Sequence, residues 1–114
     1  MPRKEYVLSG YRGMWLFTMF DLPVTTKKAR RRYTEFRKTL IKEGFSMMQY
    51  SIYARYCPSE EMADAYKRRI HTHLPSEGYV RLLMVTDRQF GKMESFIGKK
   101  DACLEKPPQQ LVFF

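Results

Sequence analysis

The stretch MWLFTMFDLP, from Met14 to Pro23, constrains the fold of this chain more than any other segment. Successive side chains of a β-strand point to opposite sides of its sheet. One side would carry Trp15, Phe17 and Met19, and the other Met14, Leu16, Thr18 and Phe20. Because both sets are largely apolar, the stretch predicts a central strand that is buried on both sides.

Asp21 comes at the end of this strand, where a side chain leaves the sheet for solvent or for a site. A carboxylate directly after a buried strand is well placed to act as a metal ligand or a general base. Aspartate is equally typical of a turn, and Pro23 would fix the backbone of that turn. The sequence leaves both roles open.

The bulk composition indicates one positively charged domain. The chain has 114 residues and a net charge of +9, which favours a polyanionic partner such as nucleic acid. We expect residues 1–13 to form an N-terminal extension and residues 14–114 a single domain. No apolar run is long enough to cross a bilayer and residues 1–13 do not resemble a signal peptide, so we expect a cytoplasmic protein without a membrane partner. Cys57 and Cys103 have no paired motif spacing and are expected to be reduced thiols.

Residues 25–43 are predicted to form a strongly basic amphipathic helix, with Thr25 or Thr26 as its N-cap and Gly44 just beyond its end. Its apolar stripe would consist of Ala29, Tyr33, Phe36 and Leu40. The opposite side would carry Lys27, Arg31, Lys38 and Lys42, with Arg30 and Arg37 on a flank. This segment holds eight Lys or Arg and only two Glu, so most of the excess charge of the chain lies on one helix. Because a solvated surface usually mixes both signs, the helix favours contact with nucleic-acid phosphates.

The rest of the chain alternates between strand and helix patterns. Residues 45–57 indicate two strands with a turn near Gln49 and Tyr50, although no Asn-Gly or Gly-X signal marks that turn. A second helix is predicted from Ser59 to about Leu74, with a buried stripe of Met62, Tyr66, Ile70 and Leu74. The further predicted elements are a strand at 79–86, a short helical turn with Phe90, Met93, Phe96 and Ile97, and a last strand at about 109–114. The order βαββαβ is typical of an α+β ferredoxin-like sandwich, here with an additional C-terminal strand.

Both strands 14–21 and 79–86 are apolar on both sides, yet the two helices of a ferredoxin-like fold cover only one face of the sheet. A second copy is the simplest cover for the other face, so we predict a homodimer with its sheets packed face to face. The last strand is expected to pair with the other protomer and close an exposed sheet edge. Its residues at this contact would be Leu111, Val112, Phe113 and Phe114.

Candidates for catalysis are few. The sequence has no Gly-rich phosphate loop, no Cys-x-x-Cys pair and no His-Glu-x-x-His motif. His71 and His73 would face different sides of a helix, so we expect them to be exposed at its end rather than to share a metal. One aspartate is a poor Mg²⁺ site, but two copies of Asp21 near a dimer axis would supply two carboxylates for metal-assisted phosphodiester hydrolysis.

Several segments together resemble a known family. They are FTMFDLP, RRRYTEFRKTLIKEGFSMMQYSIYARY and GYVRLLMVTDRQFGKM, followed by LVFF at the end. The chain is similar to the small CRISPR-associated protein that is the second member of the universal spacer-acquisition pair. The resemblance covers nearly all of the chain beyond Gly13, and VTDRQFGKM together with LVFF is most similar to the branch that accompanies type II systems.

The resemblance implies a ferredoxin-like homodimer that binds duplex DNA and bridges two dimers of the CRISPR integrase during spacer acquisition. It places DNA contacts at the start of the first helix, at Lys27, Lys28, Arg30 and Arg31. It also implies an alternative, a nuclease for RNA or DNA that depends on Mg²⁺ or Mn²⁺ shared between the protomers. Asp21 would then be the catalytic and metal-binding residue, although Phe20 stands where some members carry a tyrosine. A toxin-like ribonuclease that acts without the integrase is a third possibility, but the broad positive surface and the few catalytic groups favour the scaffold.

Overall fold

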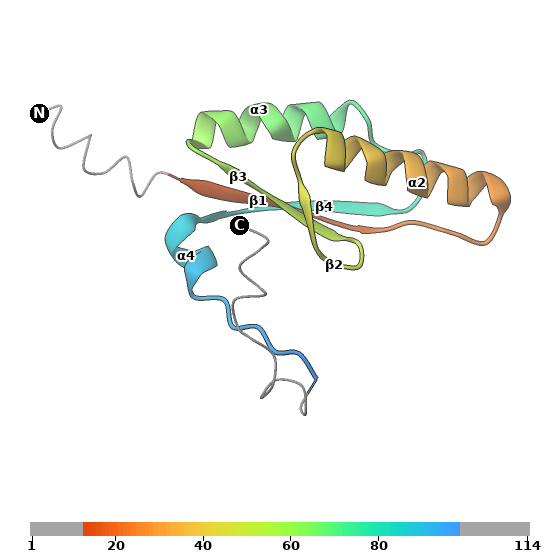
Figure 1. Cartoon of the computed structure of the whole chain (residues 1–114). Coiled ribbons are helices and arrows are strands. Elements are labelled where there is room, and N and C mark those ends of the chain that lie inside the picture. Colours follow the sequence, from red (N-terminus) through yellow and green to blue (C-terminus); the bar gives the residue numbers. More distant parts are fainter. Residues whose placement is uncertain (1–12, 99–114) are drawn as a thin grey trace, which may run out of the picture.

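The computed structural model describes residues 13–98, which form a sheet of four strands with helices on both of its faces. The elements are β1 (Met14–Asp21), α2 (Lys27–Lys42), β2 (Ser46–Gln49), β3 (Ile52–Cys57), α3 (Glu60–His71), β4 (Tyr79–Thr86) and α4 (Asp87–Gly91). The strands are antiparallel and lie in the order β2-β3-β1-β4. Helices α2 and α3 lie side by side on one face, and α4 lies on the other (Figure 1). The fold is the ferredoxin-like α+β arrangement that the order of elements predicts.

Two predicted segments lie outside the described residues. One is the N-terminal extension, except for Gly13, and the other is the strand at about 109–114 with Leu111 to Phe114. No helix in residues 13–98 has the length and apolar character needed to span a membrane.

Strand β1 is the centre of the sheet, because it pairs with β3 on one side and β4 on the other. On the face under α2 and α3, the side chains of Leu16 and Thr18 are fully buried and Phe20 nearly so. On the opposite face Trp15 is buried, whereas Phe17 and Met19 are half-buried. The predicted alternation of β1 is therefore confirmed, with tighter burial on the side of the two long helices.

Helix α2 begins where a capping residue satisfies its first turn. Thr26 has an extended backbone, and its hydroxyl oxygen accepts a hydrogen bond of 3.0 Å from the Ala29 N–H. The predicted apolar stripe is confirmed, since Ala29, Phe36 and Leu40 are buried. After Lys42 the chain turns through Gly44, whose φ of +89° belongs to the left-handed region that glycine adopts without strain.

Helix α3 is shorter than the sequence predicted, and its predicted stripe is confirmed at Tyr66 and Ile70 but not at Met62 and Leu74. It ends at His71, because Pro75 disfavours helical backbone in the preceding residue and Thr72 Oγ1 donates a hydrogen bond to the Arg69 carbonyl at 2.8 Å. Residues Ala63 and Ile70 are fully buried, whereas Met62 and Leu74 are exposed. A repeat of four residues drifts around a helix that has 3.6 residues per turn, so the predicted stripe rotates away from the core.

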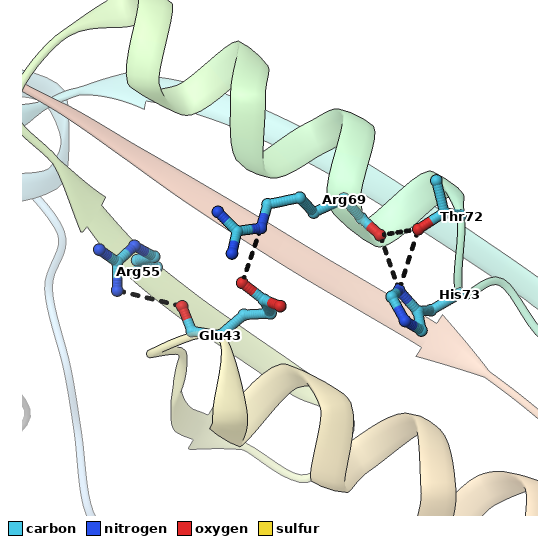
Figure 2. A network of polar contacts seen from close by, with 5 residues as sticks. All are labelled: Glu43, Arg55, Arg69, Thr72 and His73. Carbon is cyan, nitrogen blue, oxygen red and sulfur yellow. Dashed lines mark hydrogen bonds and ion pairs between the residues drawn. The ribbon is translucent and has the colours of Figure 1, made fainter.

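A polar network joins the end of α2 to β3 and α3 (Figure 2). Arg69 Nε lies 3.1 Å from a carboxylate oxygen of Glu43, and Arg55 donates a hydrogen bond of 3.1 Å to the Glu43 carbonyl. The Arg55 guanidinium also lies 4.1 Å from the centre of the Tyr66 ring. Beyond α3, His73 Nδ1 lies 2.9 Å from the Arg69 carbonyl oxygen. These contacts fix α2 relative to α3 on the same face of the sheet.

The opposite face of the sheet is covered at one end only. Phe90 of α4 stacks on Trp15 with ring centres 3.9 Å apart, and the Trp15 indole N–H donates to Asp87 Oδ1 at 2.9 Å. Of the four apolar residues predicted to lie in a short helical turn, only Phe90 belongs to α4 and is buried, and Met93, Phe96 and Ile97 are exposed. The reason is that α4 ends at Gly91, so the later residues do not return to the sheet.

We predict that Gly78→Ala destabilises the protein by at least about 1–2 kcal/mol. Gly78 has a φ of +94°, and an added Cβ would lie 2.7 Å from the carbonyl oxygen of Asp21. Urea denaturation measures the loss. Gly91→Ala is the matched control, because nothing lies within 4 Å of its added Cβ. Equal stability of the two variants would contradict this role of Gly78.

Candidate nucleic-acid interface

The six predicted nucleic-acid-binding cations all lie on α2 and all are exposed. They are Lys27, Lys28, Arg30, Arg31, Lys38 and Lys42. Within residues 13–98 none of them forms an ion pair with an acidic side chain, and the ion pairs that are present involve Arg32, Lys67 and Arg69. Arg30 also donates a hydrogen bond of 3.1 Å to the Val24 carbonyl, which extends its side chain toward the start of the helix. The positive charge of α2 therefore remains available to an external polyanion.

The charge on α2 opposes the stability of the helix itself. A helix N-terminus carries partial positive charge, which acidic residues complement and cations oppose by about 0.3–1 kcal/mol each. Helix α3 follows the usual pattern, with Glu60 and Glu61 in its first turn and cations in its last turn. Helix α2 has no acidic residue in its first turn and begins with Lys27 and Lys28. Helix stability thus does not account for these two lysines.

The flank of α2 that faces the β2–β3 hairpin carries polar and aromatic groups that were not predicted as site residues. Arg37 Nε donates a hydrogen bond of 2.7 Å to the Tyr53 hydroxyl. The Tyr33 hydroxyl lies 3.2 Å from Ser51 Oγ at the hairpin turn. The rings of Tyr33 and Tyr50 are stacked with centres 6.1 Å apart. The alternation of Arg30, Tyr33 and Arg37 along one side of a helix was the sequence signal for this surface.

Asp21 is exposed at the end of β1, as the sequence predicted. It lies opposite Tyr79 of β4 and, by the alternation of the strand, points to the same side of the sheet as Trp15 and Phe17. No hydrogen bond or ion pair involves its carboxylate among the described residues. Asp87, which follows β4, lies at the other end of the sheet because the two strands are antiparallel.

The described residues of a single chain do not form a metal site. No group of three or more His, Cys, Asp or Glu in residues 13–98 is arranged to hold a metal ion. His71 and His73 are exposed at the end of α3, where the sequence placed them. Cys57 is buried as a free thiol, and desolvation raises its pKa, so it stays protonated and is a poor nucleophile at neutral pH.

The fold and the exposed cations together define a small ferredoxin-like protein with one strongly basic helix. The family model described as CRISPR associated protein Cas2 matches residues 14–93. This chain belongs to the Cas2 family, which confirms the family predicted from the sequence.

Several relatives carry the name CRISPR-associated endoribonuclease Cas2. The one from Flavobacterium psychrophilum is 48% identical over 107 residues, which cover 94% of this chain and 93% of the relative. The one from Parvibaculum lavamentivorans is 46% identical over 101 residues, which cover 89% of this chain and all of the relative. A more distant relative from Streptococcus mutans is 35% identical over 100 residues, with 88% of this chain and 92% of the relative covered.

Proposed function

We propose that this Cas2 protein is a dimeric scaffold for spacer acquisition, which binds duplex DNA without sequence preference and bridges dimers of the CRISPR integrase. The observation that carries the proposal is the set of six exposed cations on α2 that have no acidic partner among residues 13–98. Phosphates alternate regularly along a duplex, so a helix that presents cations along its length can follow the backbone without reading bases. A positive scaffold of this kind needs no catalytic group.

The sheet face opposite α2 and α3 supports the dimer in this proposal. Away from the end that α4 covers, Leu83 is 49% exposed and Tyr79 is 67% exposed on that face. Leu83 lies opposite Phe17 in the register of β1 and β4, so the two residues form an apolar surface at the centre of the sheet. The exposed Arg81 lies between Leu83 and Tyr79 on the same face. A second copy that packs its own sheet here buries the same residues on both protomers, as a two-fold contact requires. It also leaves α2 of each protomer on the outside of the dimer.

We predict that Leu83→Glu converts the dimer to monomers, because a charge in an apolar interface loses its hydration without a partner. Sedimentation at micromolar protein concentration measures the mass. Met62→Glu is the matched control: Met62 is also exposed and apolar, but it lies on α3 on the other face. The dimer is excluded if the unmodified protein sediments as a monomer.

We predict that reversing charges on α2 weakens DNA binding but stabilises the folded protein. Lys27→Glu combined with Arg31→Glu should weaken duplex binding at low salt and reduce its salt dependence by about one unit of log–log slope per lost phosphate contact. Lys27→Glu alone should raise the free energy of unfolding by about 0.3–1 kcal/mol, since glutamate suits a helix N-terminus. Fluorescence anisotropy and urea denaturation measure the two effects. Arg88→Glu combined with Lys92→Glu makes the same change of charge at α4 and should weaken duplex binding much less. Equal weakening by this control would argue against α2 as the interface.

A second function, metal-dependent phosphodiester hydrolysis, is favoured by the exposed carboxylate of Asp21 at the strand end. The names of the relatives describe endoribonucleases, which agrees with this chemistry. One chain supplies a single carboxylate, so the proposal requires Asp21 of both protomers, which point to the same sheet face that forms the proposed dimer. A Mg²⁺ or Mn²⁺ ion held there would polarise the phosphate and acidify a bound water. The role of Asp21 would be to hold the ion in place.

We predict that Asp21→Asn separates the two functions, because the amide keeps the size of the side chain but removes its charge. Duplex binding and the dimer should be unchanged, and any metal-dependent cleavage of RNA or DNA should fall by at least about 100-fold, the usual loss for a missing catalytic group. The scaffold function is tested by measuring spacer acquisition in cells that carry Asp21→Asn, and the scaffold proposal expects acquisition to continue. Acquisition that disappears while the variant still assembles with the integrase would overturn the scaffold as the sole function.

A further inference from the structure

Tyr50 is the most unusual side chain on the surface beside α2. It lies in the turn between β2 and β3 and is 76% exposed, which is far above the usual exposure of a tyrosine ring in a small domain. One side of the ring stacks on Tyr33 of α2, with an angle of 24° between the two planes. The exposed fraction shows that much of the ring faces solvent. An aromatic surface is thus held open rather than packed.

Cations lie on both sides of Tyr33, the residue that supports this open ring. Arg30 and Arg37 lie one turn before and after Tyr33 on the same flank of α2. Arg37 is held by its hydrogen bond to the Tyr53 hydroxyl. Its positive charge also acts on the Tyr50 hydroxyl and tends to lower the pKa of Tyr50. The neighbouring Tyr33 side chain has the larger effect and raises the pKa of Tyr50, and a tyrosine is already neutral at physiological pH at its ordinary pKa. The surface therefore combines a neutral aromatic ring with fixed positive charge.

The hairpin turn holds Tyr50 in place at a cost in backbone strain. Ser51 has a φ of +64° and is the only residue other than glycine with positive φ in the described part of the chain. That conformation costs a side-chain-bearing residue about 1–2 kcal/mol. Two contacts hold it: the Ser51 carbonyl accepts a hydrogen bond of 3.0 Å from the Phe20 N–H, and its hydroxyl lies 3.2 Å from the Tyr33 hydroxyl. Strain that neighbouring contacts maintain in this way is typical of binding surfaces.

We propose that Tyr50, supported by Tyr33 and lying beside the flank of α2 that carries Arg30 and Arg37, is a stacking site for an unpaired nucleobase. An exposed aromatic ring next to cations is the usual surface for single-stranded nucleic acid, where bases stack on the ring and phosphates contact the cations. A paired base has no free face except at the end of a duplex, so the site discriminates between unpaired and paired strands. DNA and RNA bases both fit, because both present the same π-surface.

This inference rests on the proposed function in one respect, since the phosphates that flank the unpaired base would follow the same basic helix. The two proposals remain distinguishable because they depend on different forces. Contacts between cations and phosphates weaken as salt increases, whereas stacking on Tyr50 persists. Charge reversal on α2 should affect paired and unpaired strands alike. Loss of the Tyr50 ring should affect unpaired strands alone.

The test compares three probes of one sequence, a single-stranded DNA, a single-stranded RNA and a blunt duplex DNA, with the full-length protein. Tyr50→Ala should lower the affinity for at least one single-stranded probe by about fivefold or more, which is the contribution of one stacked base to binding. Its affinity for the duplex should be unchanged. The single-stranded probe that loses more affinity identifies the natural ligand as DNA or RNA. The ratio of affinities between the two proteins should stay constant when salt is raised.

Two further variants exclude an effect on folding. Tyr50→Phe keeps the ring and should bind as the unmodified protein does, whereas Tyr50→Leu keeps an apolar side chain of similar size and should bind as Tyr50→Ala does. Phe96→Ala removes another highly exposed ring outside α2 and the hairpin, and should bind normally. A 2-aminopurine base in the single-stranded probe reports stacking directly through quenching of its fluorescence, which Tyr50→Ala should reduce.

The inference is overturned if Tyr50→Ala binds all three probes normally or weakens the duplex as much as the single strands. If charge reversal at Lys27 and Arg31 leaves every probe unaffected, the basic-helix interface fails instead, and the comparison of Tyr50→Ala with Tyr50→Phe still decides the stacking site. Normal quenching in Tyr50→Leu would also contradict a role for the ring.

Discussion

Burial of β1 on both faces is the constraint on which the structure depends. The strand lies between β3 and β4, and its inward face supplies Leu16, Thr18 and Phe20 to the core under α2 and α3. Those two helices occupy one face of the sheet. The cations of α2 that point away from the core are therefore exposed to solvent. The other face receives only α4 at one end, through the stack of Phe90 on Trp15. The sheet built around β1 thus separates the charged surface of α2 from the apolar sheet face on the other side.

The charged surface is built at the expense of local stability. Lysines at the N-terminus of α2 oppose the helix dipole, and Ser51 holds a backbone conformation that glycine adopts more easily. Both features occur on the same side of the molecule, around α2 and the adjacent hairpin. The network of Glu43, Arg55 and Arg69 compensates by anchoring the other end of α2 to β3 and α3. The network therefore holds α2 in place against the sheet and α3.

Most of the fold was predictable because its signals are local. The apolar alternation of β1 and the stripe of Ala29, Phe36 and Leu40 on α2 are visible in short windows of sequence, and the structure has both. The predicted stripe of α3 was right for Tyr66 and Ile70 and wrong for Met62 and Leu74, because a spacing of four residues drifts around a helix that has 3.6 residues per turn. Of the site, the exposed cations of α2 and the end of β1 at Asp21 were predictable. The turn near Gln49 and Tyr50 was also predicted, but the contact of Tyr50 with Tyr33 was missed, because it depends on how the hairpin packs against α2.

The sequence by itself determined the order of elements, the family and the concentration of positive charge on one helix, because periodicity and charge count depend only on neighbouring residues. Only the tertiary structure decided which of those charges lack acidic partners, that Tyr33 and Tyr50 stack, and that Asp21 and Asp87 lie at opposite ends of the sheet. These facts depend on strand register and on the packing of a helix against a hairpin. Such contacts join residues far apart in the chain, and no local pattern encodes their distance.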